Sequence, residues 1–158
     1  MTLIEDASSK VREALVPIVD QSFQGIYRWH ARHTLRSVSW VRKAVREGTP
    51  VGLTMSAMIA ADCGYLFYVA VVPAARSAGI GGLLLDDVLH LLHAKGAREV
   101  FACVRPENRA SVRLLESRSF TGTSFGDLAR SRGLGAAVNL WLRMVVAPGE
   151  KVLRTSLT

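Results

Sequence analysis

The chain has 158 residues, of which 49% are hydrophobic and 21% are charged. This balance excludes a disordered or low-complexity protein and favours one globular domain, which we place over residues 1–158. The net charge is +7, and much of it lies within residues 27–48. A basic surface attracts phosphates, acidic substrates or nucleic acid, but a solvated basic face would account for the same charge.

The sequence carries no targeting or metal-binding signal. The first ten residues contain two acidic side chains and no apolar core, unlike a signal peptide. Asp62 is the only charged residue between positions 50 and 75, but ADCG interrupts that apolar run, so we expect two buried strands and no membrane span. Cys63 and Cys103 form no CxxC pair, and the four histidines have no zinc spacing. We therefore predict a cytoplasmic protein with reduced thiols, no metal and no membrane association.

The first half of the chain predicts helices followed by strands. Residues 7–34 have apolar side chains at helical spacing, and Pro17 indicates that a second helix begins near it. The pattern then alternates over residues 37–45. Two runs rich in β-branched and aromatic residues, 51–60 and 65–72, follow on either side of a turn. These three strands predict an antiparallel meander.

The second half alternates helices and strands. We predict helices over residues 79–95 and 109–118, a loop over 126–135, and strands over 98–104, 120–125 and 136–146. A strand, a helix and a strand in succession predict a right-handed crossover and one parallel pair. The fold class is therefore α/β, with a mixed twisted sheet flanked by helices. An exposed edge strand at 136–146 could pair with a second copy of the chain, as a homodimer would require.

The segment RSAGIGG, residues 76–82, lies between a predicted strand and a predicted helix. The first amides of a helix lack an intrahelical partner, so a tight loop before the helix can direct several N–H groups at one anion. Glycine at positions 79, 81 and 82 leaves room for that approach, and Arg76 adds a cation. We interpret the segment as a phosphate-binding loop, with a close-packed turn as the alternative. The spacing matches neither a P-loop nor a dinucleotide fingerprint.

Two motifs together resemble those of the GNAT superfamily of N-acetyltransferases. VAVVPAARSAGIGGLLL, residues 69–85, is similar to the acyl-CoA signature of that family. NRASVRLLESRSF, residues 108–120, resembles a later family motif, and Asn108, Leu114 and Phe120 match it. One helix and one strand separate the two motifs, as in the family. The resemblance implies a GNAT-like fold with acetyl-CoA as cosubstrate.

The resemblance also implies roles for the matched positions. The amides of residues 77–82 and the side chain of Arg76 would face the CoA pyrophosphate. Main-chain groups of the preceding strand would line the pantetheine, and an N–H near Val71 would polarise the acetyl carbonyl. The residues implied to bind the cofactor are Val69, Ala70, Val71, Arg76, Ser77, Ala78, Gly79, Ile80, Gly81, Gly82, Asn108 and Ser111.

The general acid is where the sequence departs from the family. The family often uses a tyrosine to protonate the leaving thiolate, but that position is Leu115 here, and leucine has no proton to donate. We name Tyr68 as the candidate acid and Glu107, or Asp62, as a candidate relay from the amine. Each also has a structural explanation, as a core aromatic, a loop carboxylate and a turn residue. Catalysis by positioning alone, and CoA binding without catalysis, are the alternatives.

The predicted function is direct transfer of an acetyl group from acetyl-CoA to a primary amine of a protein or a small molecule. The alternative is a weakly active or inactive CoA-binding module for regulation or interaction. In this family the acceptor lies over the segments that correspond to residues 20–37 and 125–138, and their basic character leans toward an acidic acceptor. Nucleic acid is disfavoured as a partner because no recognition helix or aromatic stacking motif is found.

Overall fold

The computed structural model describes all 158 residues of the chain. They form two compact units, which are described one after the other. The first comprises residues 1–57 and 66–91, and the second comprises residues 58–65 and 92–158. Strands β3 (Thr49–Ala60) and β4 (Cys63–Val71) contribute residues to both units.

In the first unit the strands follow the order β1-β2-β3-β4. β1 (Thr2–Asp6) pairs antiparallel with β2 (Trp40–Arg46), and β2 pairs antiparallel with β3. The register of the second pair shifts between Ala44 and Val45. The predicted meander is therefore confirmed. The polar N-terminal strand β1 was not anticipated.

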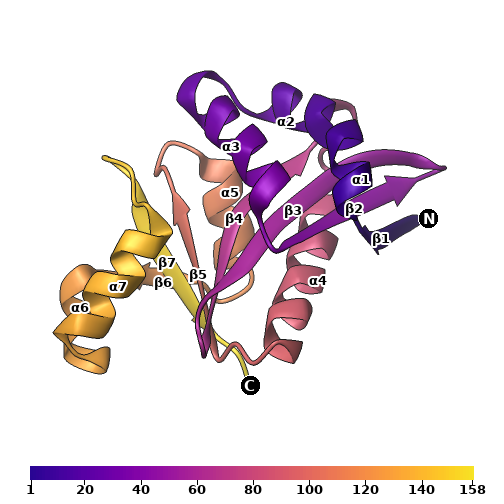
Figure 1. Cartoon of the computed structure of the whole chain (residues 1–158). Coiled ribbons are helices and arrows are strands. Elements are labelled where there is room, and N and C mark those ends of the chain that lie inside the picture. The colour runs from indigo at the N-terminus through magenta and orange to yellow at the C-terminus, as the bar shows by residue number, and fades with distance from the viewer. The chain divides into compact units, whose positions relative to one another are not determined.

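Helical segments separate β1 from β2. They are α1 (Ser9–Arg12), the short 3₁₀ turn η1 (Glu13–Leu15), α2 (Val16–Ser22) and α3 (Gly25–Ser37). Pro17 lies in the first turn of α2, where its missing N–H costs no hydrogen bond, as predicted. Figure 1 shows α2 and α3 on one side of strands β2 to β4 and α4 on the other.

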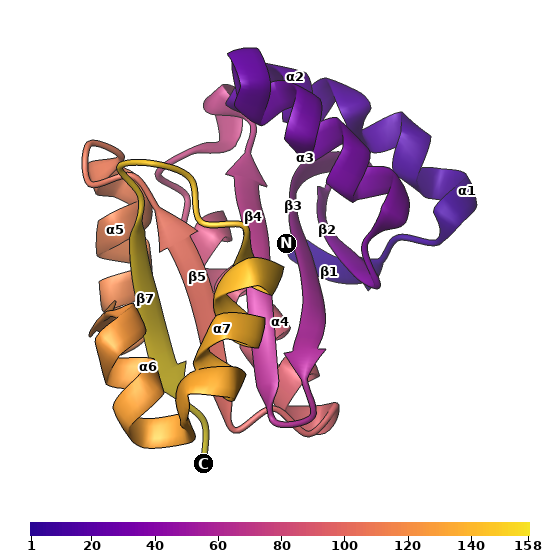
Figure 2. The same ribbon diagram turned by 60° about the vertical axis from the view of Figure 1, so that its left-hand side comes forward.

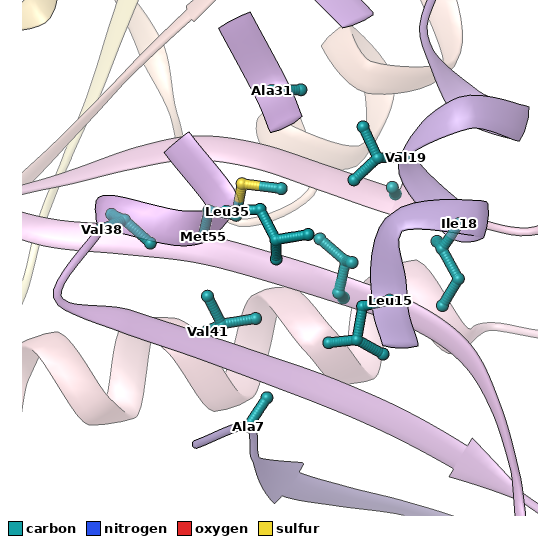
Figure 3. Close-up of a cluster of buried hydrophobic side chains, with 11 residues drawn as sticks. Ala7, Leu15, Ile18, Val19, Ala31, Leu35, Val38, Val41 and Met55 are labelled. Carbon is teal, nitrogen blue, oxygen red and sulfur yellow. The ribbon is translucent and has the colours of Figure 1, made fainter. Parts of the chain in front are cut away.

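The main core of the first unit lies between the N-terminal helices and the strands (Figure 3). Leu15, Val19 and Leu35 from the helices are fully buried, as are Val41 and Met55 from the strands. Each large aliphatic side chain removed from water in this way contributes about 1.5–3 kcal/mol. This packing fixes the position of α3 above β3 and β4.

Arg12 ties the first helix to the end of α3. Its guanidinium donates to the carbonyl oxygens of Val38 at 2.6 Å and Leu35 at 3.2 Å. These are carbonyls at the C-terminus of α3, which have no intrahelical partner and carry partial negative charge. One cation therefore satisfies them and orders the helix end.

α4 (Ile80–Ala94) follows the 3₁₀ turn η2 (Pro73–Ala75) and covers the opposite face of the strands. Ile80 and Leu84 are buried there with Ala44, Val51 and Ala75. The helix predicted over residues 79–95 is thus confirmed to within a residue at each end. Its broad leucine-rich face is explained by packing across a sheet.

In the second unit β5 (Glu99–Val104) follows the β3–β4 hairpin in the sheet, and β7 (Lys151–Ser156) and β6 (Thr121–Thr123) complete the order β4-β5-β7-β6. β5 forms the one parallel pair, with β4, whereas β7 is antiparallel to both β5 and β6. α5 (Arg109–Glu116) connects β5 to β6. The crossover arrangement predicted from the strand–helix–strand order is confirmed.

The segment between β6 and β7 corrects the sequence prediction. The residues predicted as a loop contain α6 (Phe125–Arg132), and those predicted as a final strand form α7 (Leu134–Met144). Ala137, Leu140 and Met144, at helical spacing, are the buried residues of α7. Phe125 and Trp141 meet edge to face with ring centroids 5.7 Å apart, and the two helices lie together beside β7 (Figure 2).

The homodimer prediction consequently loses the edge strand on which it was based. The surface of α7 exposes Leu134, Val138 and Leu142, which a helix brings onto neighbouring turns. None of the described helices is both long and apolar enough to cross a bilayer.

Candidate functional site

The end of β4 is shaped by its close contact with β3. The amide of Val72 donates to the carbonyl of Val51 at 2.9 Å. A Cβ on Gly52 would lie 2.8 Å from the carbonyl oxygen of Ala70, so glycine is needed where these strands meet. Successive amides of a strand point to opposite edges. The N–H of Val71 therefore points to the edge of β4 that faces away from β3.

The loop after η2 has an unusual backbone. Ser77 has a φ of +66° and Gly79 a φ of +77°, and both are exposed. A left-handed residue among right-handed ones turns neighbouring amides toward a common point, which is the geometry of an anion-binding nest. A Cβ on Gly79 would meet nothing within 4 Å, so glycine is required there for its φ and not for space.

The loop leads directly into the amino end of α4. The amide of Leu83 donates to the carbonyl of Gly79 at 3.1 Å. The amides of residues 79–82 precede this bond and are the four that a helix leaves without an intrahelical acceptor. They carry the positive end of the helix dipole. Ile80 is buried beneath them at 2% exposure, which anchors the first turn.

Arg76 is exposed, and its side chain folds back onto β4. The Nε donates to the carbonyl oxygen of Val71 at 3.0 Å. The cation therefore lies over the strand end and at the start of the loop, close in sequence to the nest at residues 77–79. Val71 and Arg76, two of the residues implied to bind the cofactor, are thus in direct contact.

Tyr68 makes a contact that the sequence did not reveal. Its hydroxyl oxygen lies 2.6 Å from Nδ1 of His30 on α3. The ring of Phe23 packs against the Tyr68 ring with centroids 4.8 Å apart and a tilt of 60°. Tyr68 is therefore a partly buried aromatic with its hydroxyl engaged by a titratable group.

A pocket of about 310 Å³ opens beside this pair in the first unit. Imidazoles, hydroxyls and apolar side chains line it, and none of the lining residues carries a formal charge at neutral pH when histidine is neutral. The lining residues are His30, His33, Thr34, Ser37, Val38, Ser39, Ala57 and Phe67.

The remaining predicted residues belong to the second unit, at the start of α5. Asn108 caps this helix, because its side-chain oxygen accepts from the amide of Ser111 at 3.3 Å. Glu107 is exposed and pairs with Arg105 at 3.4 Å. Leu115 is 5% exposed and occupies the core.

The candidate relay Asp62 is committed to a structural contact. Both of its carboxylate oxygens accept from Arg132 at 3.1 Å, and this hydrogen bonding holds the pKa of Asp62 below its usual range. Its main-chain carbonyl also accepts from the amide of Arg98 at 2.8 Å. Asp62 thus fastens the turn between β3 and β4, as the turn-residue alternative predicted.

The basic segment at residues 27–48 is largely paired with carboxylates. Arg32 binds Asp20 at 2.7 Å, and Arg36 binds Glu13 at 2.9 Å. In the strand that follows, Arg42 binds Asp87 at 2.8 Å, and Lys43 lies 3.4 Å from Glu5. Most of the positive charge that the sequence suggested as a binding surface is therefore neutralised locally.

A meander that leads through a nest-forming loop into a long helix, followed by a parallel crossover strand, defines a fold used by acetyltransferases. The model of the acetyltransferase (GNAT) family matches residues 6–120. The chain therefore belongs to the GNAT family. Among curated proteins, no sequence matches it.

Solved structures of this family share the fold. An acetyltransferase of the GNAT family from Desulfovibrio desulfuricans superposes with a TM-score of 0.76 at 14% identity, and the match covers 100% of both chains. The ribosomal-protein-S18-alanine N-acetyltransferase of Escherichia coli gives a TM-score of 0.72 at 16% identity over 100% of this chain and 95% of its own. The PaiA N-acetyltransferase of Thermoplasma acidophilum, solved with coenzyme A, gives 0.72 at 13% identity over 99% of each chain. Because these sequence identities are low, the structural similarity establishes a shared fold only.

Proposed function

We propose that this protein is an acetyl-CoA-dependent N-acetyltransferase that moves an acetyl group directly to a primary amine. The observation that carries the proposal is the loop at residues 76–82. It combines two left-handed residues with four helix-terminal amides in a member of the GNAT family. Relatives with this fold have been solved with coenzyme A.

The pyrophosphate of CoA is the anion that suits this loop. The amides of residues 77–82 would donate to its oxygens, and Arg76 would add a charge-assisted hydrogen bond after releasing the Val71 carbonyl. Main-chain groups of Val69, Ala70 and Val71 would line the pantetheine. The N–H of Val71, on the edge away from β3, would polarise the acetyl carbonyl. Asn108 and Ser111 would contact the pantetheine or adenosine.

The reaction needs a neutral amine as nucleophile and a proton for the departing thiolate. We propose Tyr68 as the side chain that moves a proton beside the acetyl group. It directly precedes the strand residues assigned to the pantetheine, and its hydroxyl has a titratable partner. Glu107, exposed and paired with Arg105 at 3.4 Å, would serve as a relay through water from the amine. The acceptor is a protein or small-molecule amine, and the paired arginines of α3 do not favour an acidic one.

Calorimetric titration of acetyl-CoA tests the proposal. We expect micromolar binding to the wild type, and no measurable binding to Gly81→Trp, whose indole would occupy the space above the helix amides. Gly135→Trp is the matched control, because its Cβ would meet nothing within 4 Å on α7. Absence of binding to the wild type would overturn the proposal. Binding without CoA release in the presence of any amine would favour the CoA-binding module instead.

A further inference from the structure

The hydrogen bond between Tyr68 and His30 joins β4 to α3, and the two residues are 38 positions apart in the sequence. The side chains of His30 and Tyr68 are both partly buried, and the ring of Phe23 packs against that of Tyr68. His30 also lines the pocket of about 310 Å³ in the first unit. The contact therefore connects a pocket wall to the strand that we assign to the pantetheine.

Which group donates in this hydrogen bond depends on the tautomer of His30. An N–H donor to oxygen is usually found 2.7–3.2 Å from its acceptor, whereas hydroxyl donors approach more closely. The separation of 2.6 Å suits the Tyr68 hydroxyl as donor and Nδ1 of His30 as acceptor, and the proton path proposed below requires this arrangement. The Thr34 hydroxyl lies 3.5 Å from the same Nδ1 and donates to the main-chain carbonyl of His30 at 2.8 Å, which holds this part of α3 in place. In this arrangement the imidazole is neutral, with its hydrogen on Nε2 and a lone pair on Nδ1.

We propose that His30 acts through Tyr68 as the proton store of the acetyl transfer, taking the amine's proton first and returning it to the thiolate of CoA afterwards. The inference rests on the proposed function, whose site lacks the family tyrosine at Leu115. Beyond that function, His30 joins the proposed site, and the proton moves from the amine to His30 and then to the thiolate.

Tyr68 passes protons in both directions during the transfer. The amine nitrogen forms a bond to the acetyl carbon and becomes acidic. Its proton passes to Oη of Tyr68 while the original hydroxyl proton of Tyr68 passes to Nδ1 of His30. The carbon–sulfur bond then breaks, the thiolate takes the hydroxyl proton of Tyr68, and the imidazolium returns its proton to Oη. The amide and the CoA thiol are formed, and both side chains return to their starting states.

The ordinary proton affinities suit this order. A histidine has a pKa near 6.5, so it is mostly neutral at pH 7 and can accept a proton, whereas a thiol near 8.5 is the stronger base and takes the proton back. Tyrosine alone, near 10, would be a poor base because its hydroxyl oxygen cannot keep the added proton. The hydrogen bond to His30 is what allows one hydroxyl to serve in both directions.

Few other titratable groups on the packed elements compete for this role. Asp20 on α2 is bound by Arg32, and Arg36 by Glu13. The remaining titratable side chains of α3 are Tyr27, Arg28 and His33, and β3 has none. Of these, His33 shares the pocket wall with His30 and stacks on Trp29 with ring centroids 6.0 Å apart.

The first test is NMR of the histidine side chains in the intact protein. We expect the nitrogen shifts of His30 to show a hydrogen on Nε2 and none on Nδ1 at pH 8, and Tyr68→Phe to shift the Nδ1 resonance. A hydrogen on Nδ1 would overturn the proposal, because Tyr68 could not then pass its proton to that atom.

The second test is kinetic. Amino-acid amides, free amino acids and polyamines are screened as acceptors with acetyl-CoA, and kcat is measured against pH for His30→Asn, Tyr68→Phe and the double variant. Asparagine keeps a hydrogen-bonding group near Nδ1 but holds no proton at neutral pH. We expect kcat to fall about 10²–10⁴-fold in His30→Asn, the affinity for acetyl-CoA to stay the same, and the acidic limb of the wild-type pH profile of kcat to disappear. The double variant should be no slower than Tyr68→Phe, because the two residues act as one unit. His90→Asn, exposed on α4, is the control and should keep wild-type rates.

The two proposals can fail separately. A wild type that binds acetyl-CoA and acetylates an amine, with a His30→Asn variant of unchanged rate and pH profile, would overturn the proton store and leave the acetyltransferase standing. A wild type that does not bind acetyl-CoA, or that acetylates no amine in the screen, would overturn both. Thermal melts of each variant show whether a lost rate reflects lost folding.

Discussion

Arg132 on α6 binds Glu99 on β5, with Nη2 of the guanidinium 2.6 Å from Oε1 of the carboxylate. The same guanidinium binds Asp62 at 3.1 Å, and Arg154 on β7 binds Glu99 at 3.2 Å. Four side chains from four segments of the second unit thus form one network. It explains how the helices inserted between β6 and β7 are attached to the strands.

Replacing Arg132 by methionine should destabilise the protein. Only 19% of the side chain is exposed on Arg132 and on Glu99, so removing the cation takes an ion-pair partner from a largely buried carboxylate, and it also leaves the half-exposed Asp62 without its guanidinium. We expect the free energy of unfolding to fall by about 1–3 kcal/mol, measured by urea denaturation. Arg130→Met is the control, because 76% of that side chain is exposed, and its effect should stay within about 0.5 kcal/mol. Equal effects of the two substitutions would contradict a role for the network.

The same network predicts a dependence on pH. Hydrogen bonding to Arg132 lowers the pKa of Asp62 in the folded protein. A lowered pKa contributes stability that is fully present above the unfolded value, about 3.9, and is lost as the pH falls through the folded value. The difference in urea midpoint between wild type and Arg132→Met should therefore be constant from pH 6 to 5 and shrink below about pH 4. A difference that stays the same down to pH 3 would show that Asp62 does not contribute through its charge.

Gly52 lies where the structure has no room for a Cβ atom. An added Cβ would lie 2.8 Å from the carbonyl of Ala70 and 3.0 Å from Cδ1 of Leu84. Gly52→Ala must therefore move β4 or α4, and we expect a loss of about 1–3 kcal/mol in urea denaturation. Because Ala70 precedes the proposed oxyanion-binding amide of Val71, acetyl-CoA affinity should fall as well. Gly135→Ala, in open space on α7, is the control and should gain up to about 1 kcal/mol. A neutral Gly52→Ala would mean that the strands can separate without cost.

The parts of the fold that the sequence predicted are those with local signals. The loop at residues 76–82 and α4 follow from glycine spacing and a long leucine-rich period, and the β3–β4 hairpin from two apolar runs around a turn. The prediction of a strand over residues 136–146 was wrong because AAVNLWLRMVV contains enough β-branched and aromatic residues to resemble a strand. What makes it a helix is packing on α6, where Trp141 meets Phe125. The short polar strand β1 had no local signal.

Contacts between distant residues could not be predicted in this way. The sequence placed His30 on a helix and Tyr68 on a strand, but their hydrogen bond depends on how α3 packs over β4. The one available signal was the position of His30 beside the buried face of α3, formed by Ala31, Thr34 and Leu35. The choice between a basic binding surface and a basic face without a ligand could not be made from the sequence for the same reason. Arg32 and Arg36 find partners on α2 and η1 that only the packed structure brings close.

The two cysteines should be unreactive in the folded protein. Burial raises the pKa of Cys63 to about 12 and that of Cys103 to about 11. At pH 8 each has far less thiolate than an ordinary cysteine near 8.5, so an aromatic disulfide reagent should modify both about 10²–10³-fold more slowly than free cysteine. In denaturant both thiols should react at once. In the folded protein the two thiols should react at different rates, and the variants Cys63→Ser and Cys103→Ser show which thiol accounts for which rate. The half-buried Cys103 should react faster than the buried Cys63.

This measurement also bears on the direct transfer mechanism. An acetyl-enzyme route through a cysteine would need the thiolate of that residue, and Cys103 on β5 is the less buried of the two cysteines. Incubation with acetyl-CoA in the absence of an amine should leave the mass of the protein unchanged, and Cys103→Ser should keep the wild-type rate. An acetyl group found on Cys103, removed on addition of an amine, would replace direct transfer with a covalent intermediate. The high thiol pKa argues against that outcome, because a neutral thiol is a poor nucleophile.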